Sequence, residues 1–159
     1  MGAMETTRSP VTEYRLLVVE DNPGDARLVQ EYLMEGLGLG AEVIILARSL
    51  AEARQRLGES GFDVILLDPE LPDSLGIETL VAAREAAPDL AIVGLAGLND
   101  QETALQAVRE GAQDYVLKSE LSPSSLARCI HYASERHRMQ KELRAHAHRL
   151  VDSELQLRT

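Results

Sequence analysis

Five short apolar segments alternate with amphipathic segments along this chain, and this alternation is the feature that most limits its fold. The apolar segments are rich in Leu, Val and Ile, and they lie at 14–20, 41–47, 62–68, 90–96 and 114–118. They are too apolar to leave one face in water, as is typical of strands that are buried on both faces. The sequence therefore predicts an α/β fold, a doubly wound five-stranded parallel sheet with helices on both faces.

Capping residues mark where the intervening helices begin and end. Asn22 is a suitable N-cap for a helix that has Pro23 at its first position and that Gly36 can end. Ser49 and Glu52 have the spacing of a capping box, which predicts a second helix. The predicted helices lie over 22–36, 49–58, 74–88 and 99–111, and a last one starts near 122.

Charge and composition argue against several classes of function. The chain has 26 acidic and 16 basic residues, a net charge of -10. This balance argues against nucleic acid as a direct partner, because phosphate contacts need clustered Lys and Arg. No run of about eighteen apolar residues predicts a membrane span. The lone Cys129 rules out an internal disulfide framework. We therefore expect a cytoplasmic protein that contacts neither nucleic acid nor membrane directly.

Three segments of different character divide the chain. Residues 1–13 begin with MGAMET, which formally matches a myristoylation pattern, but we interpret this segment as a tag remnant and a flexible N-terminus. Residues 14–135 carry the strand and helix alternation, and 136–159 are predicted to form a linker helix without Gly or Pro. From Glu135 onward six basic residues oppose four acidic ones (+2), whereas the rest has 10 against 22 (-12), which supports the boundary.

A heptad repeat runs through the C-terminal segment. Leu143, Leu150 and Leu157 recur every seven residues. This spacing favours a long exposed helix that pairs as a two-stranded coiled coil, and hence a homodimer. The heptad is thin, because the intervening core positions include His146 and Ser153. A solvated, unpaired tail is the alternative.

Acidic residues follow two of the predicted strands. Glu20 and Asp21 end the first strand, and Asp68 ends the third. The carboxyl ends of parallel strands form the site-bearing edge of such a sheet. If these strands are neighbours, three carboxylates meet there, and two unit charges about 4 Å apart repel by about 4 kcal/mol at an effective dielectric of about 20. Because Mg2+ prefers carboxylate and carbonyl oxygens, it is the predicted cofactor.

Lys118 ends the fifth strand at the same predicted edge. It is one of only two lysines, the other being Lys141, and it suggests a need for a compact ammonium group. Acids, a metal, an isolated Asp and a Lys together suit phosphoryl transfer, with Asp68 as the nucleophile. Each feature alone has an ordinary explanation as a turn, a helix cap or a solvated strand end. Their occurrence at three strand ends, in this order, carries the interpretation.

Three stretches of the chain resemble a known family. LLVVEDNPGDARLVQEYL, VILLDPELPDSLGIETL and GAQDYVLKSEL are similar to the receiver domain of bacterial two-component response regulators, over about 14–135. The resemblance implies a flavodoxin-like fold with strand order 2-1-3-4-5. It implies that Asp68 accepts a phosphoryl group from a histidine kinase or phosphotransfer protein and that Lys118 contacts that group. It also implies an altered face around the fourth strand, fourth helix and fifth strand as the signal.

The same resemblance assigns the metal ligands and the class of protein. Glu20, Asp21, Asp68 and the backbone carbonyl of Glu70 would hold Mg2+. The protein would be a signalling phosphoacceptor rather than an enzyme, catalysing at most its own phosphorylation and dephosphorylation.

The chain departs from the family pattern at positions that matter for switching. Ala96 stands where the family has Ser or Thr, whose hydroxyl meets the phosphoryl group, although Gly97 still offers its backbone N–H. Tyr115 matches the switch aromatic, whose rotation follows that hydroxyl. A hydrogen bond to a charged group is worth about 1.5–3 kcal/mol, so its loss weakens the expected switch. Pro69 replaces the usual aliphatic residue after Asp68 and favours an extended Asp68.

Two rival functions stay open, and these departures motivate the first of them. The first is a degenerate receiver that acts as a phosphorylation-independent docking or dimerisation module. The second is a hydrolase of the aspartyl-phosphate kind, suggested by the spacing of Asp68 and Glu70, although no cap domain is evident. The last nine residues, 151–159, weakly resemble the linker before a PAS sensor domain, so a downstream output domain is expected.

Overall fold

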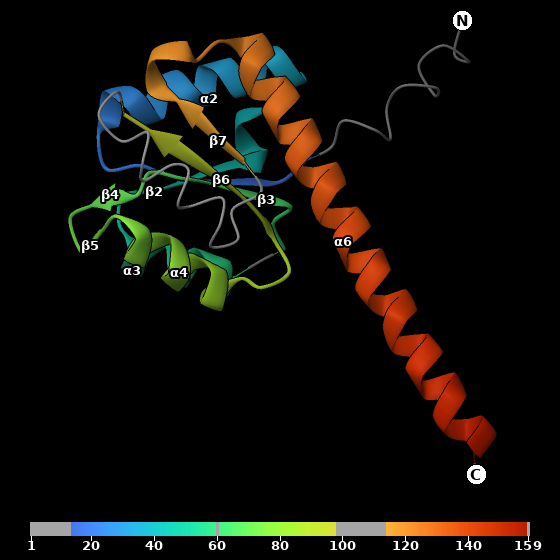
Figure 1. The fold of residues 1–159 in the computed structure, drawn as a ribbon. Helices are drawn as coiled ribbons and strands as arrows, with labels where there is room; N and C mark the ends of the chain where they lie inside the picture. The colour runs from blue at the N-terminus through green and yellow to red at the C-terminus, as the bar shows by residue number, and fades with distance from the viewer. Residues whose placement is uncertain (1–13, 60, 98–113, 159) are drawn as a thin grey trace, which may run out of the picture.

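A computed structural model describes residues 14–59, 61–97 and 114–158 (Figure 1). The segment predicted as a flexible N-terminus, 1–13, and the helix predicted over 99–111 lie outside the described residues. Among the described helices, none is both long and apolar enough to cross a membrane.

Five parallel strands form the central sheet. They are β1 (Leu16–Val19), β2 (Ile44–Ala47), β3 (Val64–Leu67), β6 (Ala91–Ala96) and β7 (Asp114–Leu117). Their order is β2-β1-β3-β6-β7, so the predicted flavodoxin-like order 2-1-3-4-5 is confirmed. Val19 pairs with both Ala47 and Leu67, so β1 and β3 end at the same level. This register places the residues that follow β1 beside those that follow β3.

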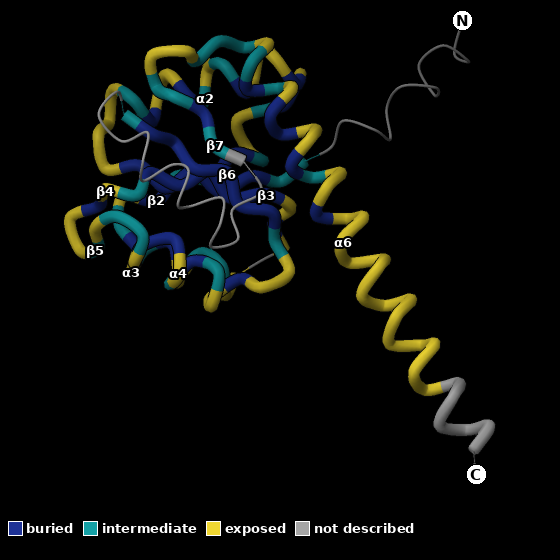
Figure 2. Tube along the Cα trace, in the orientation of Figure 1, coloured by how far each residue is buried: buried dark blue, intermediate teal, exposed yellow. Residues whose placement is uncertain are grey.

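Helices cover both faces of the sheet. They are α2 (Pro23–Leu37), α3 (Leu50–Leu57), α4 (Ile77–Ala86) and α6 (Pro123–Arg158). Helices α2 and α6 pack on one face, and α3 and α4 on the other (Figure 1). Successive residues of β1 point to opposite faces, so Leu16 joins one core and Leu17 the other. Both are fully buried, and Figure 2 shows the centre of the sheet mostly as buried, which explains the continuous apolar runs of the sequence.

The first predicted helix end is wrong. Gly36 lies inside α2, which ends at Leu37. The C-cap is Gly38, whose φ of 68° is left-handed and suits glycine. Gly36 serves packing instead, because a Cβ there would lie 2.9 Å from the carbonyl carbon of Pro123 and 3.3 Å from the Cβ of Ala127. The missing side chain therefore lets α2 approach the start of α6.

The helix predicted over 74–88 is shorter in the structure. Helix α4 begins at Ile77, and the residues before it form an antiparallel hairpin of β4 (Glu70–Leu71) and β5 (Ser74–Leu75). The sequence analysis missed this hairpin. The Pro72 and Asp73 pair at its turn is the signal that could have indicated it.

Helix α6 extends far beyond the sheet, as predicted (Figures 1 and 2). His137 is still buried, and its Nε2 lies 2.7 Å from the backbone oxygen of Asp89. Every residue from 138 to 152 is exposed, and Leu143 and Leu150 are 69% and 54% exposed. The self-pairing of this helix and the domain boundary at 135 stay predictions.

Candidate functional site

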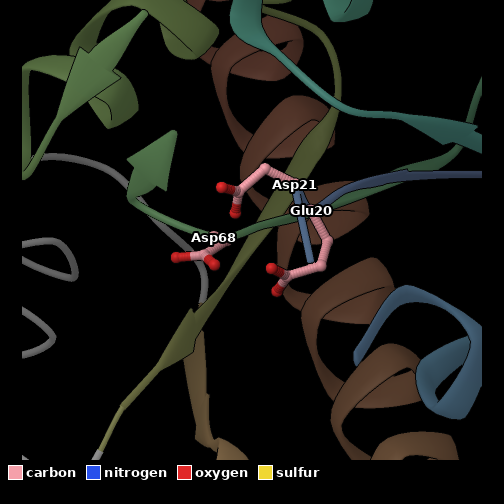
Figure 3. A group of neighbouring side chains, drawn as sticks. All are labelled: Glu20, Asp21 and Asp68. Atoms are coloured by element: carbon pink, nitrogen blue, oxygen red, sulfur yellow. The ribbon is translucent and has the colours of Figure 1, made fainter. Parts of the chain in front are cut away.

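Three carboxylates meet at the edge where β1 and β3 end. Glu20 and Asp21 follow β1, Asp68 follows β3, and one oxygen from each lies within 4.8 Å of the others. Figure 3 shows the three carboxyl groups pointing toward a common space. Glu20 and Asp68 are buried, whereas Asp21 is exposed. A cavity of about 350 Å³ opens here, and its lining also includes Leu75 of the hairpin.

Both carboxylate oxygens of Asp68 have a partner. Oδ1 accepts a hydrogen bond from the backbone N–H of Glu70 at 2.9 Å, and Oδ2 accepts one from Nζ of Lys118 at 2.9 Å. The backbone N–H of Asp68 donates to the carbonyl of Val19 at 2.9 Å, which continues the strand pairing by one residue. Asp68 is therefore a positioned carboxylate at the sheet edge.

Lys118 contacts three carboxylates. Its Nζ lies 2.8 Å from Oε2 of Glu20, 2.9 Å from Oδ2 of Asp68 and 3.3 Å from Oδ2 of Asp25. The sequence analysis placed Lys118 at this edge but missed Asp25, which lies in the first turn of α2. Its position in the first turn of the predicted helix, directly after the acidic end of the first strand, was the available signal.

The charges at this edge shift the pKa values of their neighbours. Burial raises the pKa of Glu20 to about 7, and the contact with Lys118 offsets this only in part, because the nearby Asp68 raises the pKa further. Burial alone would lower the pKa of Lys118, but Glu20 and Asp68 outweigh burial and raise it above its usual range. Lys118 is therefore held as a cation among the carboxylates.

Glu20 has an oxygen without a hydrogen bond. Its side chain is 0% exposed, and Oε1 accepts from the backbone N–H of Asn22 at 3.1 Å. Among the described residues, Oε2 accepts no hydrogen bond of ordinary geometry, although it forms the 2.8 Å ion pair with Lys118. We regard this contact as an ion pair, because a short distance without suitable angles is not a hydrogen bond. A buried anionic oxygen in this state suits a cation.

The segment after Asp68 is held by a network of hydrogen bonds. The carbonyl of Pro69 accepts from the backbone N–H of Gly76 at 2.9 Å and from the hydroxyl of Thr79 at 2.8 Å. Both carboxylate oxygens of Asp73 accept backbone N–H groups at the start of α3, from Leu50 and Ala51 at 2.9 Å each. These hydrogen bonds lower the pKa of Asp73. The hairpin thus joins the segment after Asp68 to α3 and α4.

The residues expected to form the switch lie near the same edge. Ala96 ends β6, is buried, and pairs with Leu117, which directly precedes Lys118. Gly97 follows β6 and is partly buried. Tyr115 lies in β7 opposite Gly94 and is partly buried. The structure thus brings Ala96 level with the residue before Lys118, and the roles of these residues stay predictions.

Comparison with known proteins points to one family. A family model of the response regulator receiver domain matches residues 16–131. The regulatory protein LuxO of Vibrio cholerae is 36% identical over 101 residues, which are 64% of this chain and 21% of LuxO. The two-component response regulator ARR22 of Arabidopsis thaliana is 30% identical over 135 residues, covering 79% of this chain and 89% of ARR22. The chain thus spans about a fifth of the length of LuxO.

Solved structures agree with this result. The solution structure of the beryllofluoride-activated NtrC4 receiver domain dimer is similar, with a TM-score of 0.66 and 28% identity, over 77% of this chain and 98% of that one. The chain therefore belongs to the response regulator receiver domain family.

Proposed function

We propose that this chain is a phosphoacceptor receiver, in which Asp68 takes a phosphoryl group from a histidine kinase or phosphotransfer protein. The observation that carries the proposal is the placement of Asp68 within 2.9 Å of the Lys118 ammonium, beside Glu20 and Asp21. A carboxylate nucleophile needs access from a cavity, a nearby cation and oxygen ligands for a metal, and the cavity beside Asp68 gives that access. Family membership supports the same conclusion.

Magnesium fits the donors present at this edge. Glu20, Asp21, Asp68 and the backbone carbonyl of Glu70 would hold it, and all are the hard oxygen ligands that Mg2+ prefers. The buried Oε2 of Glu20, which forms an ion pair with Lys118 but accepts no hydrogen bond among the described residues, supports this fit. Bound Mg2+ would neutralise charge on the carboxylates and on the phosphoryl oxygens.

Asp68 and Lys118 would have different roles in phosphoryl transfer. The Asp68 carboxylate attacks phosphorus, an O–P bond forms, the N–P bond of the phosphohistidine breaks, and the imidazole leaves with the electron pair. Lys118 stays protonated, because its pKa is raised, and it contacts the incoming phosphoryl oxygens. Such a protein is a signalling phosphoacceptor that at most catalyses its own phosphorylation and dephosphorylation.

The switch is atypical under this proposal. Ala96 has no hydroxyl to offer a phosphoryl oxygen, so the backbone N–H of Gly97 is the donor that remains at this position. Rotation of Tyr115 is then coupled more weakly to Asp68, because the lost hydrogen bond to a charged group is worth about 1.5–3 kcal/mol.

The setting of the domain is also a proposal. We place the domain in the bacterial cytoplasm. We also place it upstream of an output domain, since its relative LuxO is about five times as long as the matched segment. A homodimer through α6 is supported by the exposed Leu143 and Leu150 of its heptad.

The decisive experiment treats the full chain with Mg2+ and acetyl phosphate and maps the adduct by mass spectrometry. We expect one acyl phosphate on Asp68, which forms only when Mg2+ is present. The Asp68→Asn variant is the matched control and should stay unmodified. An unmodified wild-type protein, or equal labelling of the variant, would rule out the phosphoacceptor role.

A degenerate receiver that serves only for docking or dimerisation is the second candidate. Ala96 and Pro69 near the site, together with the exposed apolar residues of α6, favour it. Under this alternative, deletion of 139–159 abolishes self-association while Asp68→Ala leaves it intact, as measured by size-exclusion chromatography with light scattering. A dimer that survives the deletion would contradict this alternative.

A further inference from the structure

Asp25 is a carboxylate that contacts Lys118 from outside the group of metal-binding acids. It lies in the first turn of α2, its side chain is 44% exposed, and its Oδ2 accepts a hydrogen bond from Lys118 Nζ at 3.3 Å. The oxygens of Glu20, Asp21 and Asp68 form the compact group that can hold a cation. Lys118 therefore links this group to a separate acid on the helix.

The local structure of α2 places Asp25 within reach of Lys118. The side chain of Asn22 accepts hydrogen bonds from the backbone N–H groups of Gly24 at 2.9 Å and Asp25 at 3.1 Å. The backbone N–H of Asn22 donates to Oε1 of Glu20 at 3.1 Å. The chain from Glu20 to Asp25 is thus tied together, so the position of the Asp25 backbone is set by the same residues that form the acidic edge.

The three carboxylates in contact with Lys118 differ in how readily they can lose that contact. An ammonium group has three N–H donors. Glu20 is 0% exposed in its side chain and would leave a buried charge unpaired if Lys118 moved away. Asp25 has the longest contact and the most exposed side chain, so water can replace Lys118 there at small cost. Asp25 is therefore the acceptor that Lys118 releases first.

We propose that Asp25 is a positioning residue that draws the Lys118 ammonium toward α2 in the unmodified protein and competes with a phosphoryl group on Asp68 for it. The inference rests on the proposed phosphoacceptor function. Its consequence is that the charge of Asp25 lowers the affinity of the site for a phosphoryl group or its mimic. Removal of that charge should shift the balance toward the modified state.

A simpler role for Asp25 makes a different prediction. An acid in the first turn of a helix is stabilised by the helix dipole, and this role does not involve Lys118. Asp25→Asn removes the negative charge under either role. The NMR resonances of Lys118 change only if Asp25 contacts Lys118. The chain has two lysines, Lys118 and Lys141, so lysine-labelled NMR can observe the ammonium directly and use Lys141 as an internal reference.

The experiment compares the full-length wild-type chain with Asp25→Asn and Asp25→Glu. The matched control is Glu31→Gln, which removes an acid paired with Arg27 on the same helix at 3.2 Å. We expect Asp25→Asn to shift the Lys118 resonances and to leave those of Lys141 unchanged. At saturating Mg2+, its affinity for beryllofluoride should rise roughly twofold to fivefold, the range for a partly exposed ion pair. Asp25→Glu should restore wild-type behaviour in part, and Glu31→Gln should change neither measurement.

Each outcome decides between the roles. Unchanged Lys118 resonances and unchanged beryllofluoride affinity in Asp25→Asn would overturn the proposal, even if the melting temperature fell, because a fall in stability alone is what the helix-dipole role predicts. A lower affinity of Asp25→Asn for beryllofluoride would contradict the proposed competition for Lys118. If the wild-type chain takes up no beryllofluoride at Asp68, the proposed function fails and the competition fails with it. The Lys118 resonances would still show whether Asp25 makes the contact.

Discussion

Nζ of Lys118 lies 2.9 Å from Oδ2 of Asp68, although the two residues are 50 positions apart and their strands are separated in the sheet by β6. The contact therefore spans a neighbouring strand. It places one cation where Glu20 and Asp68, both buried, would otherwise face each other as anions. A cation in this position offsets the repulsion between the two buried carboxylates.

Replacement of Lys118 by Met should destabilise the metal-free protein. The variant leaves the buried carboxylates without their cation, and breaking a buried pair in this way costs about 3 kcal/mol. Millimolar Mg2+ should recover part of this loss by replacing the lost positive charge. The free energy of unfolding, from urea titration with and without Mg2+, measures both effects. Lys141→Met is the control, because Lys141 is exposed, and equal stability of the two variants would contradict the argument.

Restoring a hydroxyl at position 96 should strengthen phosphoryl binding. Ala96 is buried at the end of β6, so a new hydroxyl there could donate to an anionic oxygen on Asp68 at a gain of about 1.5–3 kcal/mol. Beryllofluoride affinity at saturating Mg2+ should rise about tenfold or more in Ala96→Thr. Ala96→Val adds the same bulk without the hydroxyl and should show no gain. If Ala96→Val and Ala96→Thr have the same beryllofluoride affinity, the missing hydroxyl does not limit phosphoryl binding.

Substitution of Gly36 by Ala should destabilise the protein, although Ala is the better helix former by about 1 kcal/mol. The added Cβ would meet the backbone carbonyl of Pro123, so α2 and α6 would have to move apart. Overpacking of this kind costs about 1–3 kcal/mol. Urea denaturation measures the change. Gly61→Ala is the control, since no atom beyond its chain neighbours lies within 4 Å of its Cβ position. A stabilised Gly36→Ala would show that the helices tolerate the methyl group.

The burial of His137 should make the folded state sensitive to acid. Burial lowers the pKa of His137 and the nearby Arg84, Lys141 and Arg144 lower it further, while the hydrogen bond to the Asp89 carbonyl opposes this in part. The unfolded chain then takes up the proton at a higher pH than the folded one. This contribution to stability is complete above the unfolded pKa of about 6.5 and is lost as the pH falls toward the folded pKa.

The measurement is the melting temperature between about pH 7.5 and about pH 5.5. Wild-type protein should lose more stability over this range than His137→Gln, which keeps an N–H donor but does not titrate. His148→Gln, at an exposed position of α6, should follow the wild type. The same loss in wild type and His137→Gln would show that protonation of His137 does not govern the acid sensitivity.

Local signals along the chain were enough to predict the strands, the start of α2 at Pro23 and the start of α3 after Ser49. The predicted cap at Ser49 is confirmed, because its side chain accepts a hydrogen bond from the backbone N–H of Glu52. These features depend on residues within a few positions of each other, so the sequence alone contains them. The strand order came from the resemblance to receiver domains, which summarises tertiary information from other proteins. Asp68 was already predicted as the nucleophile from its position at a strand end.

The sequence alone did not predict which residues far apart in the chain are in contact. Gly36 looked like a helix end because glycine is common there, and only the approach of Pro123 shows that it is a packing position. The 3.3 Å contact of Asp25 with Lys118 likewise depends on how α2 meets the end of β7. The sequence by itself determined which backbone conformation each segment prefers. Only the tertiary structure decided which distant groups meet, because the distances between them are set by the packing of whole elements against one another.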